Sequence, residues 1–286
     1  MPLVKVEEIY RKARQGGYAV SGFCVENLDM VLAILNAAEA TRAPVVIVIW
    51  EADRQSVGGG YLEAVIRHGA TCATVPVGIM LDHGTSLASC LQCIQDGHSA
   101  VMFDASHASL AENIHQTRQV CEIAHMLGAL VEGELGTVRR SFESSGPYAE
   151  ETVLTDPEQV ASYVYETGVD ALAISIGTES GIPSDRPRLD YDRLKAIAAS
   201  TAAYLILHGG SGLSAEDVRQ AVVNGVTAFR FASELRIAYL DALATARQAL
   251  PPDFPDTRFI YPPARQAAQA VIQTRLEQMG CAGKAW

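Results

Sequence analysis

Short runs of apolar and β-branched residues recur along the chain, separated by segments in which apolar and polar positions alternate with helical spacing. Nearly continuous hydrophobicity over a short run is typical of a parallel strand that is buried on both faces. The pattern therefore predicts eight buried strands, at Ala19–Cys24, Val45–Trp50, Val77–Leu81, Ala100–Asp104, Ala129–Glu134, Ala171–Ile176, Tyr204–His208 and Ala228–Phe231.

The segments between these runs predict helices, because their apolar residues return every three or four positions. Two of them also carry start signals. Asp156 can cap a helix whose first turn accommodates Pro157, and Ser214 with Asp217 three residues later nearly forms a capping box. Helices are predicted at Asn27–Ala40, Leu110–Leu127, Pro157–Thr167 and Ser214–Asn224.

Eight strand–helix units in a chain of 286 residues predict an α/β fold, the (β/α)₈ TIM barrel. A doubly wound sheet is the alternative, but it requires a GxGxxG motif after the first strand, and none is present there. We predict one domain over residues 1–286, with the barrel at 18–250 and a C-terminal extension at 251–286 that carries a helix over Ala264–Met279. The long connection Gly136–Thr155 is expected to be functional or mobile.

Charge and hydropathy narrow the classes of partner. Lys and Arg number 22 against 33 Asp and Glu, a net charge of −11, which disfavours binding to nucleic acid or to an anionic membrane. No apolar run approaches the ~20 residues of a membrane span, and the N-terminus lacks the apolar core of a secretory signal. These features predict a cytoplasmic protein, and a local pocket can still bind a small anion.

The six cysteines do not form the pattern of a disulfide framework. Cys90 and Cys93 form a CxxC, but they lie within an apolar helical pattern, and no second CxxC accompanies them. We interpret them as two small buried residues on one helix face.

Ionisable side chains follow several of the predicted strands. Asp82 and His83 end the third strand, Glu132 and Glu134 lie at the end of the fifth, and His208 ends the seventh. A TIM barrel gathers its C-terminal strand ends at one mouth, where the active sites of such barrels lie. Two neutral imidazoles and a carboxylate suit Zn²⁺ or a similar ion. The sequence therefore predicts a divalent-metal site at this mouth.

The motif HGGSG at 208–212 predicts a phosphate site. Its glycines expose backbone N–H groups just before the predicted helix Ser214–Asn224, and loops after the last two strands are the usual phosphate position in such barrels. Ala232 and Ser233, after the eighth strand, can add a backbone N–H and a hydroxyl.

Several motifs together resemble the class II, metal-dependent ketose-bisphosphate aldolases, the family of fructose- and tagatose-bisphosphate aldolases. The matching segments occur in the same order, from LDHG (81–84) through SH…AEN (106–113), VEGELG (131–136), LTDP (154–157), GVDALAISIGT (168–178) and LHGGSG (207–212) to ASEL (232–235). The resemblance implies a (β/α)₈ barrel that forms a homodimer or homotetramer. It also implies a zinc ion that polarises the carbonyl of a ketose phosphate.

The resemblance implies roles for individual residues. Asp82 corresponds to the residue that transfers a proton at the substrate hydroxyl, His83 and His208 to zinc ligands, and Glu134 to a carboxylate ligand of some members. Glu143 is the nearest candidate for the mobile acid of the loop after the fifth strand. The residues that correspond to the phosphate site are Gly181, Gly209, Ser211, Ala232 and Ser233.

The chain departs from the family pattern mainly at the reacting end of the site. Ser180 stands where relatives have a third imidazole, Arg230 replaces a substrate-contacting Asn, Cys24 replaces another Asn, and Arg139–Arg140 replaces a Gly-Gly hinge. His83, His208 and Glu134 still suffice for catalytic zinc or for another divalent ion such as iron or cobalt, although the altered site could also hold no metal. Arg230 could clamp a carboxylate or phosphate, which favours a changed substrate.

The sequence thus predicts a metal-dependent aldolase, a carbon–carbon lyase, that acts on a phosphorylated ketose or a related sugar acid rather than on fructose or tagatose bisphosphate. An epimerase or isomerase that uses Asp82 for proton transfer remains an alternative. A non-catalytic homologue that binds a phosphorylated ligand is the other alternative.

Overall fold

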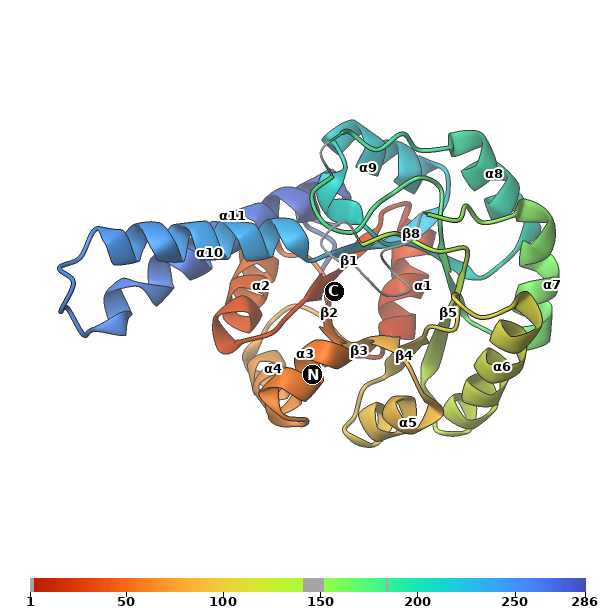
Figure 1. Ribbon diagram of the computed structural model, residues 1–286, viewed down its shortest axis with the longest axis horizontal. Coiled ribbons are helices and arrows are strands. Elements are labelled where there is room, and N and C mark those ends of the chain that lie inside the picture. Colours follow the sequence, from red (N-terminus) through yellow and green to blue (C-terminus); the bar gives the residue numbers. More distant parts are fainter. Residues whose placement is uncertain (1–2, 141–151, 184) are drawn as a thin grey trace.

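Eight parallel strands form a closed barrel in the computed structural model, which describes residues 3–140, 152–183 and 185–286 (Figure 1). Each strand pairs with its neighbour in sequence, and β8 closes the barrel against β1. The prediction of a TIM barrel is confirmed. The strands are β1 (Val20–Cys24), β2 (Val45–Trp50), β3 (Val77–Gly84), β4 (Ala100–Phe103), β5 (Leu130–Leu135), β6 (Ala171–Ile174), β7 (Tyr204–Leu207) and β8 (Val226–Phe231).

The helices surround the barrel, and their ends follow the predicted capping chemistry. The Asp156 side chain accepts a hydrogen bond from the backbone N–H of Glu158, and Ser214 forms a capping box with Asp217. The helices of the described part are α1 (Val6–Gly16), α2 (Leu28–Thr41), α3 (Glu51–Val57), α4 (Tyr61–Cys72), α5 (Leu87–Gln95), α6 (Leu110–Met126), α7 (Pro157–Thr167), α8 (Tyr191–Ser200), α9 (Ala215–Val223), α10 (Ser233–Gln248) and α11 (Tyr261–Gln278).

Helix α1 covers the N-terminal end of the barrel. Val4, just before it, donates its backbone N–H to Val77 at the start of β3, and Val6 donates to the Ser99 side chain just before β4. Tyr10 of α1 is completely buried, and its ring packs edge-on against Tyr204. The opposite end, where the strands finish, is therefore the end at which a site can open to solvent.

Helices α10 and α11 form a hairpin that extends away from the barrel (Figure 1). Helix α11 begins at Tyr261, three residues earlier than predicted, because Pro262 and Pro263 are accommodated in its first turn. Arg275 of α11 joins the two helices through an ion pair with Glu234 of α10, and it ties the hairpin to the barrel by donating a hydrogen bond to the Leu213 carbonyl. None of the described helices combines the length and apolar character needed to cross a membrane.

All six cysteines lie in the described part of the chain and are unpaired. Cys72 is exposed, whereas the other five are buried. Burial raises the pKa of Cys90 and of Cys93 to about 12, so neither thiol ionises readily. Their position on α5 agrees with the interpretation as small buried residues.

A thiol reagent should therefore distinguish one cysteine from the rest. We expect DTNB to react rapidly with a single thiol in the native protein and with six after denaturation, because only Cys72 is exposed. The Cys72→Ser variant should lose the rapid phase. Rapid labelling of Cys90 or Cys93 in the native protein, located by mass spectrometry, would contradict this assignment.

Candidate active site

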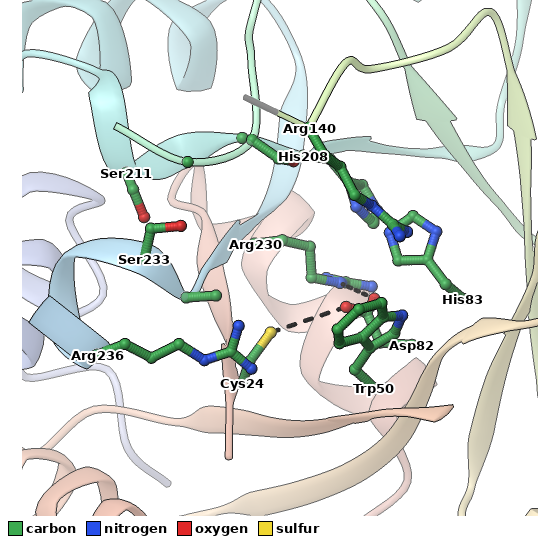
Figure 2. Close-up of a pocket in the computed structure, with 14 residues that line it drawn as sticks. Cys24, Trp50, Asp82, His83, Arg140, His208, Ser211, Arg230, Ser233 and Arg236 are labelled. Carbon is green, nitrogen blue, oxygen red and sulfur yellow. Dashed lines mark hydrogen bonds and ion pairs between the residues drawn. The ribbon is translucent and has the colours of Figure 1, made fainter. Parts of the chain in front are cut away.

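A pocket of about 530 Å³ opens at the C-terminal ends of the strands (Figure 2). Ser211 and Ser233 lie on one side, whereas Trp50, His83 and Arg140 lie on the other (Figure 2). The complete lining is Cys24, Trp50, Asp82, His83, Arg140, Ser180, Gly181, His208, Gly209, Ser211, Arg230, Ala232, Ser233 and Arg236.

His83 is held by a carboxylate of the next strand end. Its Nδ1 lies 2.7 Å from Oδ2 of Asp104 and 3.8 Å from Oε2 of Glu134. The other oxygen of Asp104 accepts hydrogen bonds from the backbone N–H and the hydroxyl of Ser106, so Asp104 is fixed in turn. Because the carboxylate can only accept, Nδ1 carries the proton, and a metal would be ligated by Nε2.

The backbone at His83 has a left-handed conformation, with φ 47°. The register between β3 and β4 shifts at this point, between Leu81 and Gly84. A non-glycine residue rarely adopts such a conformation unless its surroundings enforce it, and such residues are concentrated at functional sites. The irregularity directs the His83 side chain toward Asp104 and the pocket.

His208 is oriented in the same way from the other side. Its Nε2 lies 3.0 Å from Oε1 of Glu132, a completely buried residue of β5. Burial is the main cause that lowers the pKa of His208, although its hydrogen bond to Glu132 opposes the shift. The two imidazole rings meet edge to face at 4.8 Å. A neutral imidazole with one nitrogen bonded to a carboxylate is a common arrangement in metal sites.

Asp82 lies between these groups and is 4% exposed. Burial by itself would raise its pKa, but His83, His208 and Arg230 outweigh that effect, and the pKa falls below its usual value. Asp82 is therefore ionised at neutral pH and available to accept a proton.

The donor atoms fit a divalent ion. Those of Asp82, His83 and His208 lie within 4.8 Å of one another, and so do those of His83, Asp104 and Glu134. The predicted set of His83, Glu134 and His208 is divided between these two groups: His83 belongs to both, whereas Glu134 and His208 do not share a group among the described residues. Burial, reinforced by Asp104, raises the pKa of Glu134 well above its usual value, and its Oε2 has no hydrogen-bond partner among the described residues. A buried carboxylate oxygen of this kind is suited to a cation.

All five predicted phosphate residues line the pocket, and Ser211 and Ser233 lie on the side opposite Trp50 (Figure 2). Gly209 has φ +69°, and a Cβ built there would lie 2.5 Å from the Glu179 carbonyl oxygen. Only glycine permits this close approach of two loops, which brings the backbone of Glu179 and Ser180 against Gly209. Gly181 and Gly209 both line the pocket. Ser211, Ala232 and Ser233 complete this side.

The altered positions also line the pocket. The Cys24 thiol lies 3.8 Å from Oδ2 of Asp82. The backbone N–H of Ser180 donates to the Arg139 carbonyl at 2.9 Å, which ties the loop after β5 to the position of the missing imidazole. The Arg140 guanidinium lies 4.9 Å from the centre of the Trp50 ring. Glu143, the predicted mobile acid, lies outside the described residues.

Sequence reasoning placed Glu132 at the barrel mouth without giving it a role, and it missed Trp50 and Arg236 as site residues. Glu132 was recognisable as a charge inside an apolar strand, and Trp50 as the last residue of β2. Arg236 lies one turn into α10 and pairs with Glu26 and Asp53. Its place in the lining depends on α10 starting immediately after β8, which the sequence pattern left unassigned.

Comparison with known proteins gives consistent results. The family described as Fructose-bisphosphate aldolase class-II matches residues 4–284. A fructose-bisphosphate aldolase of Thermus caldophilus is 34% identical over 99% of this chain and 100% of its own length. A probable fructose-bisphosphate aldolase of Bacillus subtilis (strain 168) is 34% identical over the full length of both chains.

Solved structures show the same likeness. The YdjI aldolase from Escherichia coli K12 superimposes with a TM-score of 0.85 at 28% identity, over 99% of this chain and all of that one. A putative fructose-1,6-bisphosphate aldolase from Coccidioides immitis gives a TM-score of 0.87 at 26% identity, over 98% and 97% of the two chains.

The tight contact at Gly209 predicts that replacing this glycine lowers the free energy of unfolding. Gly168 serves as a matched control, because it also has a positive φ, +77°, but a Cβ there would meet nothing within 4 Å. We expect Gly168→Ala to lose roughly 1–2 kcal/mol of unfolding free energy from its backbone conformation alone. Gly209→Ala should lose distinctly more, as measured by urea unfolding. Equal losses would show that the approach to Glu179 is not tight.

Proposed function

Because this chain belongs to the class II fructose-bisphosphate aldolase family, we propose that it is a metal-dependent aldolase whose substrate is a phosphorylated ketose or a related sugar acid. The observation that carries the proposal is the position of ionised Asp82 beside two carboxylate-oriented imidazoles, His83 and His208, in a pocket with a glycine- and serine-lined side. An acid–base group, a metal donor set and an anion site are the three parts that such a reaction needs.

His83, His208 and Glu134 would hold the metal. Class II aldolases are generally zinc-dependent, and iron or cobalt also suits two imidazoles and a carboxylate. When bound, the ion supplies a Lewis acid for the ketose carbonyl oxygen, on which negative charge develops during cleavage. The charge of Arg230 beside Asp82 makes the site less favourable for a cation than an uncharged residue there.

Asp82 carries the proton transfer in this proposal. In the retro-aldol direction its carboxylate takes the proton of the hydroxyl next to the cleaved bond. The O–H electrons form the new aldehyde carbonyl, and the electrons of the broken carbon–carbon bond pass to the ketone-bearing fragment. Buried Asp82 is held near this position by the neighbouring cations, so little reorganisation precedes the transfer.

The family implies a small phosphorylated sugar as substrate, and the glycine- and serine-lined side would hold its phosphate. Backbone N–H groups near Gly181 and Gly209, with the hydroxyls of Ser211 and Ser233, offer donors without a large side chain in the way. Holding the phosphate there would place the rest of the ketose toward Asp82 and His83 (Figure 2).

The lining opposite the phosphate side supports a substrate other than fructose or tagatose bisphosphate. Arg140, stacked on Trp50, brings positive charge to the pocket of an acidic protein. A carboxylate or a differently placed phosphate would complement this charge. Ser180 leaves this end without the third imidazole of the family pattern.

We also propose that the chain forms a homodimer or homotetramer. Helices α10 and α11 and the turn between them expose large apolar side chains that a second copy could cover. These are Ile237, Leu240, Phe259 and Tyr261.

A turnover panel tests the proposed function. The full-length protein with added zinc is incubated with fructose and tagatose bisphosphates and with ketose phosphates that end in a carboxylate, in deuterated water, and products are followed by NMR. We expect cleavage, fastest for the carboxylate-bearing compounds. Asp82→Asn should lower kcat by about 10²–10⁴-fold, because the proton acceptor is lost.

The exposed Asp192→Asn serves as the matched control and should keep full activity. Deuterium exchange at a substrate carbon without cleavage would replace the aldolase by an epimerase or isomerase. Binding of phosphorylated ligands without either reaction would indicate a non-catalytic homologue. Cleavage that Asp82→Asn leaves unchanged would contradict the assigned role of Asp82.

A further inference from the structure

Arg230 lines the pocket, but its guanidinium is bound by side chains of the barrel interior. The residue is 4% exposed, and its Nη2 forms an ion pair with the completely buried Glu132. Its Nε lies 3.4 Å from Oδ1 of Asp82, and its Nη1 donates to the Tyr10 hydroxyl at 3.2 Å. The sulfur of Met80 lies 3.3 Å from Nη2.

The barrel has room for this side chain because a glycine faces it. Gly22 of β1 pairs in register with Arg230 of β8. A Cβ at Gly22 would lie 2.8 Å from Cδ and 3.0 Å from Nη1 of Arg230. Gly22 leaves the space that the arginine side chain fills. Glu132 and Tyr10 supply a charge and a hydroxyl that bind its guanidinium.

Arg230 links two candidate site residues, His208 and Asp82. Glu132 uses one carboxylate oxygen for Arg230 and the other for Nε2 of His208, at 3.0 Å. On its other side the guanidinium faces Asp82. A single buried cation therefore lies between the carboxylate that orients His208 and the carboxylate that would transfer the proton.

We propose that Arg230 is a positioning residue, which fixes Glu132 against His208 and holds Asp82 in the pocket, and does not itself bind the substrate. This inference rests on the proposed function only for the meaning of Asp82 and His208. With Glu132 anchored, His208 keeps its proton on Nε2 and presents Nδ1 toward a ligand. Without the guanidinium, two buried carboxylates lose their shared cation, and Glu132 keeps only the hydrogen bond to His208 among the side-chain contacts of the described residues.

Three variants separate positioning from substrate binding. Arg230→Met keeps length and apolar bulk beside Met80 but removes the charge, whereas Arg230→Lys retains a charge. Gly22→Ala leaves the arginine in the sequence but crowds its Cδ, together with Cγ1 of Val48. Arg54→Met is the matched control, because Arg54 also pairs with two carboxylates, Glu63 and Asp96, away from the pocket.

The first readout is the tautomer of His208, measured by long-range ¹H–¹⁵N NMR on the full chain at one fixed pH. We expect a single Nε2–H form in the wild type and in Arg54→Met, and its loss or mixing in Arg230→Met and Gly22→Ala. Arg230→Lys should restore it in part. An unchanged Nε2–H form in both folded Arg230→Met and Gly22→Ala would overturn the inference.

The second readout is whether the substitution changes kcat or KM. A positioning role predicts that kcat falls by about 10–100-fold in Arg230→Met while KM stays nearly constant. A raised KM with unchanged kcat would instead show that Arg230 binds substrate. The NMR readout needs no turnover, so absence of cleavage by the wild type would defeat the proposed function and still leave the tautomer to decide this inference. If Arg230→Met does not fold, Gly22→Ala decides it.

Discussion

Each imidazole in the pocket is held by a buried carboxylate from another strand of the barrel or the residue just after it, His83 by Asp104 after β4 and His208 by Glu132 of β5. This pairing selects the ring nitrogen that carries the proton and directs the other one. It requires strand ends that are distant in sequence to meet within hydrogen-bond distance. Closure of the barrel provides this, because β3, β4, β5 and β7 all finish at the same mouth.

Burying so many carboxylates has an electrostatic cost that the cations in the pocket reduce. Asp82 and Glu132 share Arg230, whereas Glu134 has its pKa raised by burial and by Asp104. The distribution is uneven: Arg230 lies between Asp82 and Glu132, whereas at Glu134 burial and Asp104 outweigh the opposing effect of Arg140 on its pKa. A divalent ion would be attracted to that side.

The fold was predictable because each strand of the barrel is buried on both faces and so appears as a continuous apolar run. The strand ends also located His83 and His208, since a polar residue after such a run must lie at the mouth. The longer span of β3, to Gly84, arises from an irregular register at His83 that has no composition signal. The early start of α11 was missed because Pro262 and Pro263 were treated as preceding the helix, although the first turn tolerates them.

The network beneath the pocket was not predictable from the sequence. Arg230 looks like a substrate clamp as long as its surroundings are unknown, because an arginine at a strand end is typical of anion binding. Its internal role depends on Gly22, Tyr10 and Glu132, which come from three separate segments and meet only through the barrel register. Glu132 and Glu134 are two residues apart on β5 and so share a face, yet they contact different partners, Arg230 and His83.

The metal content of the purified protein tests the central claim, that two carboxylate-oriented imidazoles form a working metal site without a third imidazole. The protein is analysed by ICP-MS before and after zinc supplementation, beside His83→Ala. We expect about one tightly held divalent ion per chain in the wild type and its loss in the variant, since catalytic zinc needs three protein ligands. A folded wild-type protein that retains no ion after supplementation would contradict it.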